Sequence, residues 1–162
     1  PSSGSMRCYV SAVLLDKKMY VLIAGNGKFK ARGISICRKD RLGVVSNTYT
    51  RCIETIARYG RSQMSLLLIH RSLTETVSRI RAHSCTLSEI SSRKRVSGNP
   101  CYVYRASKSS TVTVEETKES GESLVRYDRS YVLDSLVSAL QPLLMACGFG
   151  TVSDVLGKFI VF

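Results

Sequence analysis

The sequence predicts an α+β protein, in which a small antiparallel β-sheet is followed by a mostly helical region that contains a β-hairpin. Three observations lead to this fold class. Short apolar runs separated by polar or glycine-rich turns occupy residues 8–37, and apolar residues at helical spacing follow over 43–83. Two more short runs and a last helical pattern occupy residues 102–148. With 44% hydrophobic residues among 162, the chain can bury a core.

The first region, residues 7–42, has the pattern of a three-stranded sheet. Apolar runs at Tyr9–Leu15 and Met19–Ala24 flank a polar tripeptide. Gly25-Asn26-Gly27 comes next, and Asn and Gly tolerate the positive φ that a tight hairpin turn requires. Phe29–Cys37 then returns as the third strand. A phosphate-binding loop is another interpretation of these glycines, but no Gly-Lys-Ser/Thr completes that motif, so the turn is favoured.

Two helices are predicted next, over residues 43–59 and 63–83, with Gly60 between them. Apolar side chains recur at intervals of 4, 3 and 4 residues in the first and of 3, 4, 4 and 3 in the second. Such intervals place the side chains on one face of a helix. The two faces consist of Val45, Tyr49, Cys52 and Ile56, and of Leu66, Ile69, Leu73, Val77 and Ile80.

Shorter elements are expected after the second helix. Thr86-Leu87-Ser88-Glu89 fits a capping box, in which the two end residues satisfy each other's exposed backbone donors, and it predicts one helical turn. Arg93-Lys94-Arg95 falls in a serine-rich stretch that we interpret as a connection. Strands are then expected at Tyr102–Arg105 and Thr111–Glu115, around a turn at Ser107–Ser110.

A last helix is predicted after a polar loop at Lys118–Ser123. Asp128 can cap its start, because a carboxylate accepts hydrogen bonds from the first free backbone N–H groups. Pro142 should kink or restart this helix, and Gly148 should end it. Its apolar face consists of Val132, Leu136 and Leu140.

The charge of the chain is strongly positive and unevenly distributed. The sequence holds 24 Lys and Arg against 12 Asp and Glu, for a net charge of +12. Residues 1–110 carry 20 basic and 5 acidic side chains, whereas residues 111–162 carry 4 and 7. Such a block is typical of proteins that bind a phosphate backbone, and a merely solvated basic surface is the alternative.

No residues in the sequence are arranged for catalysis or for binding a metal. The six cysteines form no Cys-x-x-Cys pair and only His70 and His83 accompany them, so we expect no zinc site. Most of these cysteines lie in apolar stretches, which predicts an intracellular, reducing compartment. Glu115 and Glu116 are adjacent, so on a strand they would point to opposite faces and could not act together.

Three sequence features bear on targeting. No apolar run approaches the roughly 20 residues that cross a bilayer, so we expect no membrane span and no membrane partner. No charged and apolar leader precedes a cleavage site, so we expect no signal peptide. Residues 1–6, Pro-Ser-Ser-Gly-Ser-Met, look like the remnant of an expression tag.

One series of motifs resembles a known family. It runs from Lys17-Lys18-Met19-Tyr20 through Lys30-Ala31-Arg32-Gly33 to Cys37-Arg38-Lys39-Asp40. This order resembles the family B DNA polymerases, which carry K-K-x-Y on a palm strand, then a hairpin, a strand with K-G, and R-R-D before a helix. Arg32 and Lys39 depart from that pattern but preserve the charge. Residues 30–40 are most similar to viral, herpesvirus-like members, for which a nuclear location would follow.

Two later segments continue the resemblance, which extends over residues 10–148. Ile90–Ser97 is similar to the segment that follows the second thumb helix of these enzymes, and Tyr127–Tyr131 resembles the start of their final helix. The resemblance implies a palm tail at 7–42, a thumb domain at 43–150 and a C-terminal tail at 151–162. The metal-binding aspartates of the family precede K-K-x-Y, so we expect no cofactor in this piece and Mg²⁺ in the intact enzyme.

The resemblance implies that the chain grips primer-template DNA without catalysing by itself. Lys18 and Tyr20 would reach the minor groove, whose acceptors are common to all correct base pairs, while the other cations neutralise phosphates. Asp40 would hold one of those cations in an ion pair. The implied DNA-binding residues are Lys17, Lys18, Tyr20, Arg32, Arg38, Lys39, Arg93, Lys94 and Arg95.

The tail carries a separate hypothesis. Polymerases of this family often end in a short peptide that docks on a processivity factor, and the resemblance implies that role for Leu156, Phe159 and Phe162. These residues are spaced by three, as on one side of a 3₁₀ turn. The alternative is a last strand or helix folded back on the thumb. For the whole chain, two other functions stay open: a free-standing, non-catalytic nucleic-acid-binding or replication-accessory protein, and a domain whose basic face meets an acidic protein.

Overall fold

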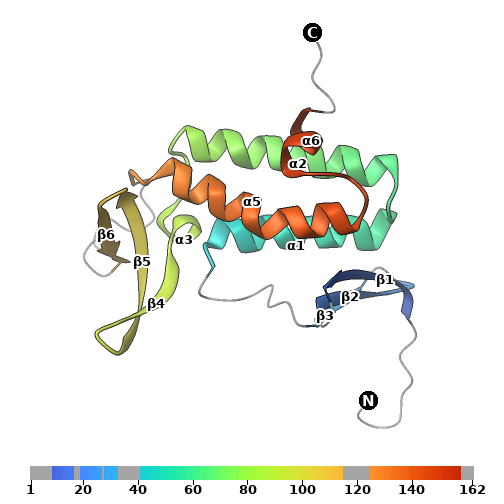
Figure 1. Ribbon diagram of the computed structural model, residues 1–162, viewed down its shortest axis with the longest axis horizontal. Coiled ribbons are helices and arrows are strands. Elements are labelled where there is room, and N and C mark those ends of the chain that lie inside the picture. The colour runs from blue at the N-terminus through green and yellow to red at the C-terminus, as the bar shows by residue number, and fades with distance from the viewer. Residues whose placement is uncertain (1–8, 17–18, 27, 33–40, 115–124, 158–162) are drawn as a thin grey trace. The chain divides into compact units, whose positions relative to one another are not determined.

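The computed structural model describes residues 9–16, 19–26, 28–32, 41–114 and 125–157. It confirms the α+β class, with two antiparallel three-stranded sheets and a set of helices (Figure 1). No helix in these ranges is both long and apolar enough to cross a membrane.

The chain forms two compact units that take up alternating stretches of sequence. The first unit contains residues 1–36, 49–71 and 140–162, and the second contains 37–48 and 72–139. The division at residues 42 and 150 that the resemblance implies stays a prediction, and the predicted tag remnant at 1–6 lies outside the described residues.

The first unit contains the sheet predicted near the N-terminus. Strands β1 (Tyr9–Asp16), β2 (Met19–Ala24) and β3 (Phe29–Arg32) pair in that order, antiparallel throughout. One face is buried through Val13, Val21 and Ile23, because alternate strand residues point to the same side. The third strand is predicted to run on to Cys37; the described strand ends at Arg32, and residues 33–40 lie outside the described ranges.

Helices α1 (Gly43–Tyr59) and α2 (Gln63–Arg81) confirm the two predicted apolar faces. Between them, Gly60 adopts a φ of +69°, a conformation that costs glycine little. The second helix is two residues shorter than predicted, because His83 has a φ of +53°. The N–H groups of Ser84 and His83 then bond to the carbonyls of Arg79 and Ile80, an arrangement that ends a helix.

The second unit contains a sheet that the sequence analysis recognised only in part. Its strands are β4 (Ser92–Val96), β5 (Asn99–Ser107) and β6 (Ser110–Thr113), antiparallel in that order. The short helix α3 (Leu87–Ile90) precedes β4 and begins as predicted, with the Glu89 carboxylate accepting the Thr86 N–H at 3.1 Å. A glycine is required beside it, because a Cβ at Gly43 would lie 2.4 Å from the Ser88 carbonyl oxygen.

The interpretation of Arg93–Arg95 as a connection is wrong, because these residues form the middle of β4. A two-residue turn joins β4 to β5, and both of its residues have positive φ: +53° at Ser97 and +83° at Gly98. Turns of this kind match the natural twist of two paired strands. The turn therefore pairs β4 with a strand that begins at Asn99, earlier than predicted.

The last two helices are α5 (Arg129–Ala146) and α6 (Val152–Gly157). Asp128 caps α5 as predicted, with its Oδ1 accepting the Tyr131 N–H at 3.3 Å. The predicted restart at Pro142 is wrong: α5 continues through it, and both Pro142 and Ser138, whose carbonyl loses its usual donor, lie on the exposed side. Gly148, with a φ of +80°, ends the helix as predicted.

Candidate nucleic-acid interface

The main candidate site lies on β4 and the part of β5 that pairs with it. Arg93, Lys94 and Arg95 are consecutive on β4 and all three are exposed. Among the described strands, β4 pairs with β5 alone, so these residues occupy an edge of the sheet. In Figure 1 the turn of this hairpin lies at the end far from β6.

Cations project from both faces of this hairpin. Successive strand residues point to opposite faces, so Arg93 and Arg95 share one face and Lys94 lies on the other. Arg93 pairs with Tyr102, which is 44% exposed, and Lys94 pairs with Cys101, which is half-buried. The sequence analysis missed Tyr102 as a member of the site, although an aromatic residue beside a basic cluster is a signal for nucleic-acid binding.

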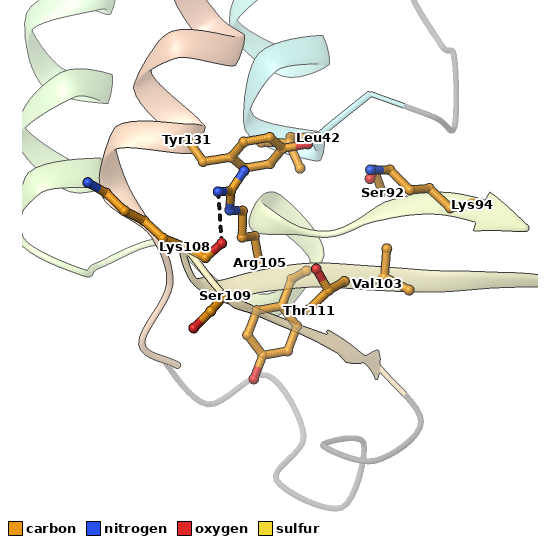
Figure 2. Close-up of a pocket in the computed structure, with 10 residues that line it drawn as sticks. Leu42, Ser92, Lys94, Val103, Arg105, Lys108, Ser109, Thr111 and Tyr131 are labelled. Carbon is orange, nitrogen blue, oxygen red and sulfur yellow. Dashed lines mark hydrogen bonds between the residues drawn. The ribbon is translucent and has the colours of Figure 1, made fainter. Parts of the chain in front are cut away.

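The face with Lys94 borders a hollow of about 310 Å³ (Figure 2). Its lining is mostly polar and comes from the three strands of the second sheet and the turn between β5 and β6, with Leu42 and Tyr131 completing it. Figure 2 shows Lys94 and Lys108 on opposite sides of Arg105, with the Lys108 side chain extending away from Lys94. The two ammonium groups therefore do not converge on one point in this hollow.

Arg105, the central cation of the hollow, is committed to holding the fold. Its Nε lies 3.3 Å from Asp128 Oδ2, and its Nη2 donates to the Lys108 carbonyl at 3.1 Å. Its guanidinium also lies over the Tyr131 ring, 5.0 Å from the centroid. The Asp128 N–H returns a bond to the Arg105 carbonyl at 2.9 Å. Arg105 therefore fastens β5 to the start of α5 and is not free to bind a ligand.

Polar contacts also fix the end of α2 beside α3. The buried Tyr127 hydroxyl donates to the carbonyl of Ile80 at 2.9 Å and accepts the Cys85 N–H at 3.4 Å. Burial raises the pKa of Tyr127, so this hydroxyl keeps its proton. Glu89 pairs with Arg79; burial raises the pKa of Glu89, but the bonds from Arg79 and Thr86 outweigh burial and leave that pKa lowered. These bonds hold the end of α2 beside the segment that leads into α3.

The predicted sites in the first unit are described only in part. Tyr20 on β2 pairs with Arg32 on β3, so the structure brings these two predicted DNA-binding residues together. Tyr20 is half-buried and Arg32 is exposed. The other predicted residues of this group lie outside the described residues: Lys17, Lys18, Arg38, Lys39 and Asp40.

The tail begins with the short helix α6. Thr151 and Asp154 cap it by exchanging bonds of 3.0 and 3.1 Å between backbone N–H and side-chain oxygen, and His70 Nδ1 lies 2.9 Å from the Val155 carbonyl oxygen. Val155 is fully buried and Leu156 is half-buried. Phe159 and Phe162, the other two residues of the predicted docking tail, lie outside the described residues.

Three of the four cysteines that the structure describes are shielded from solvent. Cys52, Cys85 and Cys147 are buried free thiols, and burial raises the pKa of Cys52 to about 12. Cys101 is the described cysteine with partial exposure. Within the described ranges, no three His, Cys, Asp or Glu side chains lie close enough together to hold a metal ion.

Comparison with known proteins gives consistent matches. The sequence model of DNA polymerase family B matches residues 6–133. A DNA polymerase of Thermococcus sp. (strain 9oN-7) is 21% identical over 87% of this chain and 22% of its own length. Those of Thermococcus hydrothermalis and Pyrococcus glycovorans are 31% and 30% identical over 44% of the chain, and over 4% and 9% of their own lengths. The chain thus spans about a fifth or less of these relatives, and no comparison supports a viral origin.

Proposed function

Because the chain belongs to DNA polymerase family B, we propose that it is the part of a DNA-directed DNA polymerase that holds the primer-template duplex. The observation that carries the proposal is the exposed run Arg93-Lys94-Arg95 on the free edge of β4, inside the segment that the family matches. In the intact enzyme, this grip would keep the primer end in place while nucleotides are transferred elsewhere in the protein.

The chemistry of the proposed site suits binding without sequence preference. Cations that contact phosphates fix the register of a protein on DNA but do not read bases. Tyr20 and Arg32, side by side on the first sheet, would form a second contact area in the same role, together with the predicted Lys17 and Lys18. Such binding must weaken steeply with salt, because each neutralised phosphate releases a counterion.

The metal that the family implies has no place among the described residues. Nucleotidyl transfer by these polymerases uses divalent ions, and Mg²⁺ would be the cofactor of the intact enzyme. We assign it to parts of that enzyme beyond the residues described, since no suitable set of ligands occurs within them. The contribution of this chain is therefore to bind and orient the duplex.

The first test measures binding of the 162-residue chain to a fluorescent primer-template duplex at several salt concentrations. We expect the logarithm of the affinity to fall linearly with the logarithm of the salt concentration, with a slope of about −0.9 for each phosphate contacted. An affinity that does not change between low and moderate salt would contradict the proposal and favour an acidic protein as the partner.

The second test uses Lys18→Ala in the intact polymerase. This change should lower the affinity for primer-template DNA and shorten the extension products, with folding unchanged. A free-standing accessory protein would instead bind DNA alone and support no primer extension in any longer form. Normal extension by the Lys18→Ala enzyme would refute the role of this lysine.

We also propose that the chain end beyond α6 docks on a processivity factor. Val155 and Leu156 belong to α6, and His70 contacts this helix at the Val155 carbonyl. The apolar residues that follow the helix, Phe159 and Phe162, support the proposal because they are the remaining members of the predicted docking set. Removal of residues 158–162 should abolish binding to the factor and leave the melting temperature unchanged. Retained binding after this truncation would refute the proposal.

A further inference from the structure

We infer that the β4–β5 hairpin enters a groove of the DNA duplex, so that its two faces contact the phosphates of opposite strands. Arg93 and Arg95 would face one strand and Lys94 the other. This inference rests on the proposed function, which requires only that the chain binds duplex DNA, and it adds how this hairpin lies on the duplex.

The first argument is the shape of the hairpin. In the described part of the chain, β6 pairs with Val103–Ser107 and no strand other than β4 and β5 lies along residues 93–102, which form a two-stranded ribbon there. Paired strands lie about 4.8 Å apart, and a two-stranded ribbon fits into the roughly 12 Å wide major groove of B-DNA. A two-stranded ribbon is therefore an element that the major groove can admit.

The second argument is the composition of the ribbon tip. Ser97, Gly98, Asn99 and Pro100 are all exposed, and none carries a charge or a large apolar side chain. Nothing at the tip would repel the phosphates on either side of a groove or block its entry. Small polar residues there can bond to base edges or water without selecting a sequence.

The third argument is the distribution of charge. Arg93 and Arg95 are two residues apart on one face, about 7 Å along the strand, and Lys94 lies between them on the other face. No ion pair links any of the three to a carboxylate in the described part of the chain. Charged side chains also protect an edge strand from pairing with other chains. That role would be filled by one or two of them and does not need cations on both faces.

The test maps phosphate contacts on each DNA strand separately by ethylation interference, using the full chain and a primer-template duplex. The variant Arg93→Ala/Arg95→Ala should lose interference on one strand, and Lys94→Ala should lose it on the other. The slope of log affinity against log salt should become shallower by about 1.8 and 0.9, respectively, with affinity falling roughly fivefold per cation removed.

Two control variants make the outcome specific. Arg71→Ala removes an exposed cation from α2 and should leave the interference pattern of the ribbon unchanged. Arg93→Lys/Arg95→Lys keeps the charge and should retain both the pattern and the salt slope. All variants should melt at the parent temperature, since the replaced side chains are exposed.

The possible results separate the inference from the function on which it rests. Loss of interference on the same DNA strand in both variants would overturn the inference, because the ribbon would then lie along a single phosphate backbone. Unchanged patterns in both variants would overturn it as well, with DNA binding by other parts of the chain left intact. Failure of the unmodified chain to bind the duplex at any salt concentration would refute the proposed function itself.

Discussion

The two sheets have the same number of strands and the same antiparallel order, but different interactions hold them. The first sheet buries one apolar face through Val13, Val21 and Ile23. In the second, β5 buries Val103 and Tyr104, but its edge strand β4 exposes its cations and is held by its pairing with β5 and by the tight turn at Ser97-Gly98. Arg105 adds polar links to Asp128 and Tyr131. The difference shows that a strand can be specified by its partner and its turn, which leaves its side chains free for binding.

The largest expected effect comes from the apolar face of the first sheet. Ile23→Ala should lower the free energy of unfolding by about 3 kcal/mol, because it leaves a cavity on the buried face of β2. A change at the exposed edge of the second sheet, Arg93→Ala, should alter this free energy by no more than about 0.5 kcal/mol. Urea denaturation measures both. Equal losses in the two variants would show that Arg93 supports its sheet as strongly as Ile23 does.

A smaller effect is expected from the polar link of the second sheet. Arg105→Ala removes an ion pair and carbonyl bonds at a half-exposed position, so we expect a loss of about 1–2 kcal/mol. Arg105→Lys restores the charge but not the planar arrangement of donors, and should recover only part of the loss. Urea denaturation again gives the values. Full stability in Arg105→Ala would mean that these polar links do not hold the sheet.

The glycine of the Ser97-Gly98 turn should contribute about 1 kcal/mol to the stability of the ribbon. Gly98 has a φ of +83°, which an alanine side chain disfavours, so Gly98→Ala should destabilise the ribbon by that amount. Gly98→Asn serves as the control, because asparagine tolerates this region of φ and should lose less. Amide exchange of the β4 and β5 backbone measures the effect locally, and uniform protection in all three proteins would contradict it.

The smallest effect concerns acid. The folded protein lowers the pKa of Glu89, so the ionised carboxylate stabilises the fold. This stabilisation is fully present above the ordinary pKa of 4.5 and is lost as the pH falls through the lowered pKa. The parent should therefore lose more melting temperature between pH 7 and acid than Glu89→Gln does. Glu54→Gln, on the exposed side of α1, should behave like the parent. If acid lowers the melting temperatures of the parent and of Glu89→Gln equally, the ionised Glu89 does not stabilise the fold.

The first sheet could be predicted from the sequence, whereas one strand of the second could not, for a physical reason. Strands β1 and β2 are short apolar runs on either side of a polar tripeptide, with a Gly-Asn-Gly turn after them, and these are local signals. Strand β4 reads Ser-Arg-Lys-Arg-Val, which has no apolar period and therefore looks like a connection. Its pairing depends on the Ser97-Gly98 turn and on β5, which are visible only when the neighbouring segments are considered together.

Long-range polar contacts are also beyond the reach of spacing arguments. Arg105 meets Asp128, and Tyr127 meets the carbonyl of Ile80, across separations that no periodicity encodes. By contrast, the capping roles of Asp128 and Glu89 are predictable, because a cap lies within three residues of its target. The family emerges from ordered motifs, and the match over residues 6–133 confirms it.

The half-buried thiol of Cys101 gives the ribbon a natural point of attachment for a spectroscopic probe. Cys52, Cys85 and Cys147 are buried and should not react with a maleimide dye, whereas the partly exposed Cys101 is accessible to it. With Cys8 and Cys37 replaced by serine, a single dye beside Lys94 would report by quenching whether this strand nears a labelled oligonucleotide.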